Sequence, residues 1–222
     1  MVPRRLFGAA LVTVPFVAHG QSSDPGSQKA ALIRTLRSLE REVGRNPRPQ
    51  ATVPARVPSS VNPIDVSARW LAAMAAKWTP AKPDEGTALL VSVNRALEAV
   101  RRPDLRQNEV WQLVAEDLSE KVEHCRAKGL AAMQRVNVIT RRGGLDEIKG
   151  LEVLYIEKFL QSDPSVKPYI FRRFSSPAVE DLAPGRYVFW SKEPGEKGRS
   201  GRRKEARVGN GFPVEPIEVL AP

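Results

Sequence analysis

His124 and Cys125 are the side chains best suited to nucleophilic chemistry, because the sequence has one cysteine and its other histidine, His19, lies near the N-terminus. On the helix that we expect here, adjacent side chains point about 100° apart, so the pair cannot act together as nucleophile and base. We therefore interpret His124 as a surface residue. A single cysteine also offers no internal disulfide.

Four carboxylates around the same position could in principle form the acid and base pair of a hydrolase. On the expected helix they lie opposite the apolar face, which favours a solvated surface. Zinc-ligand spacing, a GxSxG nucleophile elbow and a phosphate-binding loop are all missing from the sequence. We therefore expect no enzyme, no metal and no cofactor. The carboxylates are Glu116, Asp117, Glu120 and Glu123.

The segment 197–207, KGRSGRRKEAR, has six basic residues and one acidic residue. Its glycines and serine predict a loop between two strands. One interpretation, which we favour, is a solvated hairpin tip. The other is capture of phosphate or carboxylate groups. The residues that would bind the anion are Arg199, Arg202, Arg203 and Lys204.

The N-terminus has the features of a secretory signal peptide at residues 1–20. Arg4 and Arg5 precede the uncharged stretch 6–18, and small residues surround a cleavage point after Gly20. A retained membrane anchor is the alternative, but this stretch is shorter than the about 20 residues that cross a bilayer. We expect an exported protein, periplasmic or secreted, and favour the general export route over the twin-arginine route.

The whole chain of 222 residues has a net charge of +10, and loss of the two leader arginines leaves +8. Outside the cytoplasm, the anionic partners open to such a protein are membrane surfaces, lipopolysaccharide and acidic polymers. Simple solubility is the other explanation of the charge. Nucleic acid is disfavoured by the export signal and by the lack of aromatic residues beside the basic segment.

Apolar residues recur at helical spacing through residues 27–128, which predicts a helical region. Residues 45–63 interrupt it with five of the nineteen prolines and no glycine. That composition indicates a semi-extended linker, or alternatively a ligand for a proline-binding groove. In the second helix, the aromatic stripe of Trp70 and Trp78 predicts a core face. The expected helices cover 27–43, Asp65 (the cap) to Trp78, 89–100 and 108–127.

Beyond Gly129 the apolar period changes from 3.6 to 2, which predicts short strands. Turn signals separate nearly all of them, as in a small antiparallel β-sandwich at residues 134–220. The fold class is therefore α+β. About six strands are expected, at 134–140, 150–157, 169–174, 185–191, 205–208 and 216–220.

Leu182, Pro184, Gly185 and Tyr187 spell LxPGxY. Pro184 fixes one backbone angle and Gly185 permits a left-handed one, so the chain can pass from one sheet to the other. The hydroxyl of Tyr187 would then bond to the backbone of the corner.

This corner resembles that of fibronectin type III domains. Together with the hairpin sequence VNVITRRGGLDEIKGLEVLYI, it is more similar to the carboxypeptidase regulatory-like, or transthyretin-like, sandwich family. The resemblance spans residues 134–220 and implies a non-catalytic accessory module without active-site residues. The chain departs from the family pattern in its insertion at 157–177 and in its helical half.

Along the strand after the corner, Val188 and Trp190 face one way while Tyr187 and Phe189 face the other. A sandwich has one interior, so a second layer must cover the outer face. We expect that layer to be the helix at 108–127 or the helix of Trp70 and Trp78, and a partner protein is the alternative.

Two functions follow from these patterns. The first is a non-catalytic envelope protein, an interaction or structural module with an unknown protein partner. The second is an envelope protein that binds an anionic lipid or lipopolysaccharide surface through the loop at 197–207.

Overall fold

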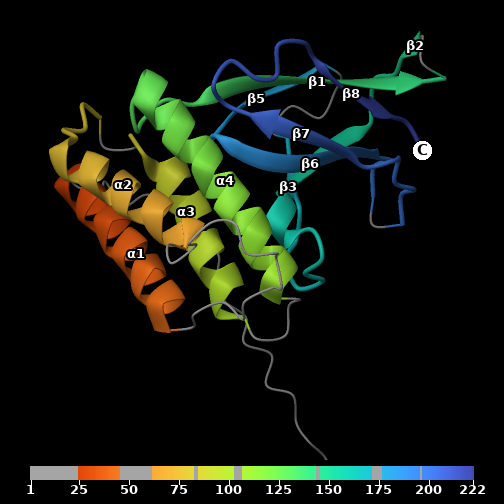
Figure 1. Ribbon diagram of the computed structural model, residues 1–222. Coiled ribbons are helices and arrows are strands. Elements are labelled where there is room, and N and C mark those ends of the chain that lie inside the picture. Colours follow the sequence, from red (N-terminus) through yellow and green to blue (C-terminus); the bar gives the residue numbers. More distant parts are fainter. Residues whose placement is uncertain are drawn as a thin grey trace, which may run out of the picture.

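The computed structural model describes residues 25–45, 62–82, 85–102, 107–143, 146–171, 177–195 and 197–222. Residues 1–20 and most of the expected linker lie outside this part of the chain. Four α-helices come first and two small sheets follow them, so the predicted α+β architecture is confirmed (Figure 1). No helix in the described ranges is both long enough and apolar enough to cross a bilayer. The helices are α1 (Pro25–Arg45), α2 (Pro63–Lys77), α3 (Thr87–Arg101) and α4 (Gln107–Lys128).

The start of α2 corrects one prediction, because its cap is Asn62 and not Asp65. The side-chain oxygen of Asn62 accepts the backbone N–H of Ile64 at 3.0 Å. Pro63 then opens the helix, where its missing N–H costs no hydrogen bond. Asp65 instead pairs with Arg69, one turn further along, at 3.0 Å.

Each helix buries one apolar face in a shared core. The stripe of Leu32, Leu36, Leu39 and Val43 on α1 is buried, as its spacing predicts. On α2 the aliphatic side chains are buried more completely than the aromatic ones. Leu71 is fully buried with Ile64, Ala68 and Ala75, whereas Trp70, Met74 and Trp78 are half-buried against this core.

In the described residues eight strands form two four-stranded sheets, where about six strands were expected. The additional strands are β5, which lacks a clear alternating pattern, and the two-residue β2. Of the strand expected at 169–174, only β4 is a strand in the described residues. The strands are β1 (Gln134–Arg142), β2 (Asp146–Glu147), β3 (Glu152–Glu157), β4 (Tyr169–Ile170), β5 (Ala178–Leu182), β6 (Gly185–Lys192), β7 (Lys204–Val208) and β8 (Ile217–Leu220).

β1 is central in the first sheet. Val138 pairs with Ala178 of β5 on one edge and with Ile217 of β8 on the other. The β1–β8 pair is parallel, whereas the sequence predicted a purely antiparallel sandwich. The predicted hairpin after β1 closes onto β2. β3 instead crosses to the second sheet, where the order is β4-β3-β6-β7.

The predicted corner lies between β5 and β6 and carries the chain from the first sheet to the second. The hydroxyl of Tyr187 donates to the carbonyl of Ala183 at 2.9 Å, which confirms the expected tyrosine corner. The prediction that Gly185 adopts a left-handed backbone angle was wrong, because its φ is not positive. A Cβ on Gly185 would lie 2.4 Å from Oδ1 of Asp117 and 3.0 Å from Nζ of Lys121. Glycine is needed here because α4 packs directly onto the corner.

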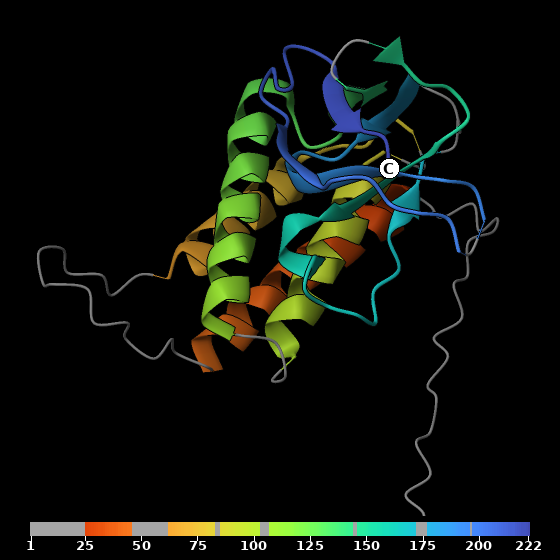
Figure 2. The same cartoon turned by 90° about the vertical axis from the view of Figure 1, so that its right-hand side faces the viewer.

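The alternation along β6 separates two cores, as predicted. Tyr187 and Phe189 lie in the sandwich interior, whereas Val188 and Trp190 join the core of the helices. α4 is the helix that packs on β6, in agreement with the expectation for residues 108–127. Figure 1 shows α4 between the other helices and the sandwich, and Figure 2 shows it at one side of the strands.

An ion pair adds a second connection between the helices and the second sheet. Arg95 on α3 donates to Glu157 at the end of β3 at 2.7 Å, and the Glu157 side chain is only 3% exposed. The same guanidinium lies 4.0 Å from the ring centroid of Tyr169 on β4. The helical half and the sandwich are therefore joined by charged as well as apolar contacts.

Candidate functional site

Several buried ionisable side chains meet where α4 crosses the start of β6. We call this set the corner seam. Its α4 members are buried, and they face the N-terminal end of β6, the end of β7 and the turn that follows. The corner seam consists of Asp117, Glu120, Lys121 and His124 from α4, with Gly185, Arg186, Arg207 and Asn210.

Asp117 and Lys121 form a fully buried ion pair one helical turn apart. One carboxylate oxygen of Asp117 contacts the Lys121 ammonium, and the other accepts the backbone N–H of Arg186 at 3.0 Å. The pair therefore fixes the first residues of β6 against α4. Burial of two charges is tolerated because each has a partner within hydrogen-bonding distance.

Glu120 lies next to this pair and is shared by two arginines. Arg207 of β7 pairs with Glu120, and it also donates to Glu123 at 2.7 Å. Arg186 lies 3.8 Å from Glu120 and 2.9 Å from Glu116. Burial raises the pKa of Glu120, and the Arg207 charge opposes that effect. These contacts connect α4 to both β6 and β7.

Both ring nitrogens of His124 are used in the structure. Nδ1 accepts the backbone N–H of Asn210 at 2.8 Å, so Nε2 carries the proton that it donates to the carbonyl of Ala132 at 3.1 Å. Burial lowers the pKa of the imidazole. His124 is therefore a neutral connector between α4, the segment before β1 and the turn after β7.

Cys125 is buried on the bundle side of α4. Burial raises the pKa of its thiol to about 11. At neutral pH only about one molecule in 10⁴ would then carry the thiolate, which is the reactive form. The geometry agrees with the expectation that His124 and Cys125 do not act together, because His124 lies in the corner seam.

Three sequence interpretations of α4 were wrong. Asp117 and Glu120 are buried and not on a solvated face, and His124 is not a surface residue. The helix has apolar contacts on one side and the sandwich corner on the other, so its polar side chains are buried by a surface of matching polarity. The sequence does contain a signal, since Asp117 and Lys121 are spaced as an ion pair. That spacing is also common on exposed helices.

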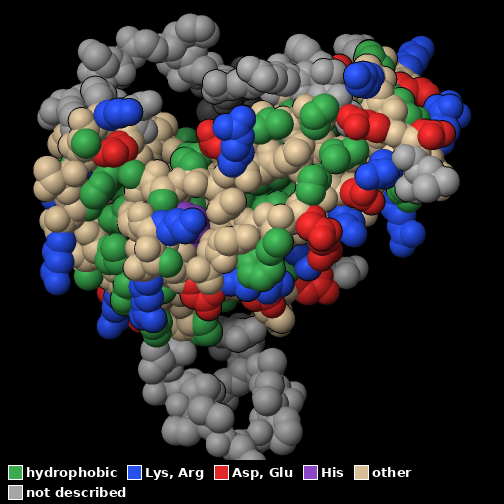
Figure 3. Space-filling model, turned by 90° about the horizontal axis from the view of Figure 1, so that it is seen from above, with side chains coloured by type: hydrophobic (Ala, Val, Ile, Leu, Met, Phe, Trp, Pro, Cys, Tyr) green, Lys and Arg blue, Asp and Glu red, His purple; other side chains and the backbone are tan. Residues whose placement is uncertain are grey.

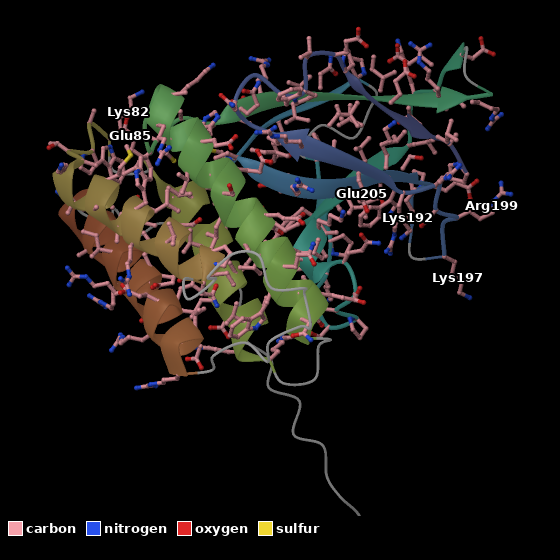
Figure 4. The ribbon with its side chains drawn as sticks, in the orientation of Figure 1. Lys82, Glu85, Lys192, Lys197, Arg199 and Glu205 are labelled. Atoms are coloured by element: carbon pink, nitrogen blue, oxygen red, sulfur yellow. The ribbon has the colours of Figure 1, made fainter. Side chains whose placement is uncertain are left out.

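The first part of the basic segment 197–207 lies at the end of the sandwich away from the helices, where Figure 4 shows Lys197 and Arg199. Its last four residues are not in a loop as expected, because Lys204–Val208 form β7 and Arg207 contacts α4. Arg199 is already engaged: its guanidinium donates to Glu193 at 2.9 Å and its backbone N–H donates to the same carboxylate at 3.2 Å. These bonds lower the pKa of Glu193. Arg199 is therefore not positioned as a free anion ligand.

The other three predicted anion ligands do not converge. Arg203 lies over the ring of Trp190, 5.2 Å from the centroid, on the helix-facing side of the second sheet. Lys204 pairs in register with Phe189, whose side chain is in the sandwich interior. The side chain of Lys204 is therefore on the face of the sheet opposite to that of Arg203. Arg202 is exposed just before β7. The structure thus divides the basic run between two faces.

No group of three or more histidine, cysteine or acidic side chains that could hold a metal ion occurs among the residues that the structure describes. Comparison with protein-family models, curated proteins and solved structures gives no match for this chain. Function must therefore be argued from the residues themselves.

Proposed function

We propose that this protein is an exported, non-catalytic module of the bacterial cell envelope that acts by binding another protein. The observation that carries this proposal is that the ionisable side chains of α4 make structural contacts inside the protein. Asp117, Lys121 and His124 are all buried. Asp117 and His124 hold α4 to the sandwich through hydrogen bonds to the backbone of Arg186 and Asn210, and Lys121 neutralises Asp117. Their chemistry serves the assembly of the two halves.

The fused architecture supports the same proposal. A helix bundle and a sandwich joined by buried charges give a rigid body with several distinct exposed faces. The LxPGxY corner resembles that of regulatory-like sandwiches, which are accessory modules. The hydrogen bond between Tyr187 and Ala183 at this corner is consistent with that resemblance. The export part of the proposal is supported by residues 1–20, which have the sequence features of a signal peptide.

The test is site-specific photo-crosslinking in living cells. The full chain, tagged at its C-terminus, is expressed in a Gram-negative bacterium with a photoreactive residue in place of Arg37, Val66 or Val214. These side chains are exposed and come from α1, α2 and the loop before β8. We expect the chain in the periplasmic fraction and a discrete protein adduct from one of these faces.

The same cells provide the control. A Cys125→Ala chain should give an identical adduct, because the proposal assigns no reaction to this thiol. The proposal is wrong if the chain remains cytoplasmic, or if it stays free of adducts at every exposed position.

Anion binding by the loop at 197–207 is the second candidate. It is favoured by Arg202 and Lys204, which are exposed and have no acidic partner among the described residues. Its test is sedimentation with phosphatidylglycerol vesicles or lipopolysaccharide, comparing wild type with a chain that carries Ala at 199, 202, 203 and 204. Binding that is equal in both chains and insensitive to salt would eliminate this candidate.

A further inference from the structure

The turn that follows β7 is a small unit with its own internal hydrogen bonds. The backbones of Gly209 and Phe212 exchange two hydrogen bonds, at 2.8 and 2.9 Å. Between them, Asn210 and Gly211 both have a positive φ, of 49° and 84°, as in two-residue hairpin turns. We call residues 209–212 the GNGF turn. Figures 1 and 2 both show the chain between β7 and β8 beside the C-terminal end of α4.

Among the described residues, one hydrogen bond holds the GNGF turn to α4. The backbone N–H of Asn210 donates to Nδ1 of His124 at 2.8 Å. The turn also lies very close to the ring and to the corner. A Cβ on Gly209 would lie 3.2 Å from Nδ1 of His124 and 2.8 Å from Cβ of Pro184. The attachment of the turn therefore depends on an acceptor at Nδ1.

Protonation of His124 would remove that acceptor. A neutral imidazole donates from one nitrogen and accepts at the other, whereas an imidazolium donates from both. Nε2 donates to the carbonyl of Ala132 at 3.1 Å in either state. The new N–H at Nδ1 would then point at the N–H of Asn210, and two donors cannot form a hydrogen bond with each other. A buried donor without a partner is costly, so the protonated ring and the turn would separate.

The surroundings give the imidazolium no replacement acceptor. His124 is fully buried, and the carboxylates nearest to it along α4, Glu120 and Glu123, are both paired with Arg207 of β7. Lys128, one turn further along α4, adds a positive charge. The groups of the corner and of the GNGF turn that lie against the ring are uncharged. Movement of the turn, which admits water to the ring, is therefore the available response to a proton.

We propose that His124 is a pH-sensitive latch, which holds the GNGF turn against α4 while the imidazole is neutral and releases the turn when the imidazole takes up a proton. The turn can move as a unit, because its two internal hydrogen bonds do not involve α4. This device depends neither on export nor on a partner protein.

Release of the turn would change the apolar surface that it presents. Phe212 is 43% exposed, and Val214, just beyond the turn, is 82% exposed. The neighbouring outer side of β1, β5 and β8 shows basic, acidic and apolar side chains mixed together (Figure 3). In the latched state, Arg207 lies 5.1 Å from the centroid of the Phe212 ring and helps to fix its position. The latch would thus control the placement of two exposed apolar side chains.

The test is a pH titration of the ¹⁵N-labelled full chain by NMR, from about pH 8 to about pH 5. The ring nitrogens of His124 report protonation, and the backbone amides of the GNGF turn report its attachment. We expect both to change with one midpoint, below 6.5. Exchange of the Asn210 amide with solvent, corrected for its intrinsic pH dependence, should become about tenfold faster, as expected for the loss of one hydrogen bond. The amides of α1 should not change, which separates release of the turn from unfolding.

Two variants assign the transition. His124→Asn offers an amide oxygen in place of Nδ1 that does not titrate in this range, so the turn should stay bound throughout. The matched control, Glu120→Gln, removes the neighbouring carboxylate and should keep the transition. The wild-type titration remains decisive if the asparagine variant folds poorly. The proposal is overturned if the ring protonates while the turn amides stay unchanged, or if the ring stays neutral until the whole chain unfolds. The same transition in His124→Asn would also overturn it.

Discussion

At the scale of single residues, the corner seam explains why particular side chains occur where they do. Gly185 has an ordinary backbone angle, and its lack of a side chain makes room for Asp117 and Lys121. His124 has a donor and an acceptor bond that together require one neutral tautomer. Both residues are therefore specified by close neighbours on other elements.

Replacing Gly185 with alanine should destabilise the protein by about 1–3 kcal/mol, the usual cost of forcing an extra carbon into a packed site. The added Cβ would meet the Asp117 carboxylate, which cannot move without losing Lys121 or the Arg186 N–H. The measurement is the urea midpoint of unfolding. As the matched control, Gly44→Ala adds a methyl group to α1 with no atom within 4 Å and should be neutral or stabilising.

His124 should make stability depend on pH just below neutrality. The pKa of its imidazole is lowered in the fold from the model-compound value of 6.5, so the unfolded chain binds more protons in this range. The stabilising contribution is complete above pH 6.5 and is lost as pH falls toward the lower, folded pKa. Nearby Lys128 adds to the depression of the pKa.

The comparison with His124→Gln isolates this effect. Glu120 acts in the opposite sense, because its pKa is raised and its stabilising contribution is lost as pH rises through the folded value. Unfolding free energies of wild type and variant are therefore measured across pH 5–8 and subtracted. The difference should shrink as pH falls below 6.5. Parallel curves would mean that His124 does not titrate between the two states.

At the scale of elements, α4 joins the two halves of the molecule. It contacts the bundle through Val114 and Leu118, and it contacts the corner of the sandwich through the buried Asp117–Lys121 pair. The side of α4 that faces the sandwich corner is therefore closed to water, whereas Gln112, Ser119 and Glu123 remain exposed. This position accounts for the burial of polar residues that would be solvated on a helix at the edge of a bundle.

Lys121→Met should destabilise the protein by about 3–5 kcal/mol, because it leaves the Asp117 carboxylate buried without a cation. The double variant D117N/K121M should recover most of that loss, since an asparagine oxygen can still accept the N–H of Arg186. Urea unfolding measures both effects. For comparison, Arg69→Met removes an exposed partner of Asp65 and should cost less than about 1 kcal/mol. A loss of similar size in Lys121→Met and Arg69→Met would contradict this account of the buried pair.

At the scale of the whole molecule, the second sheet of the sandwich contributes side chains to the apolar core of the bundle. Leu154, Ile156, Val188 and Trp190 project from the second sheet into the core of the helices. Burial of side chains of this kind contributes about 1.5–3 kcal/mol each. The sandwich is therefore not an independent unit on its helix-facing side.

A fragment containing residues 129–222 should expose those four side chains. We expect it to bind a dye that reports exposed apolar surface and to self-associate, whereas the full chain should do neither. Dye fluorescence and size-exclusion chromatography provide the measurements. A monomeric fragment without dye binding would show that the sandwich core alone is sufficient.

The sequence by itself determined the local features of this fold. The change of period after Gly129 predicted helices followed by strands, and the alternation along β6 predicted its two buried faces. LxPGxY predicted the corner and its tyrosine hydrogen bond. Each pattern depends on neighbouring positions in the chain, because side-chain direction repeats with the backbone period.

Only the tertiary structure decided the features that depend on distant segments. The burial of Asp117, the tautomer of His124 and the need for glycine at 185 all follow from α4 crossing the corner. The parallel pairing of β1 with β8 and the dispersal of the basic run at 197–207 depend on which strands become neighbours. A linear pattern shows which face of a helix is polar, but the surface that packs against that face determines whether it meets water.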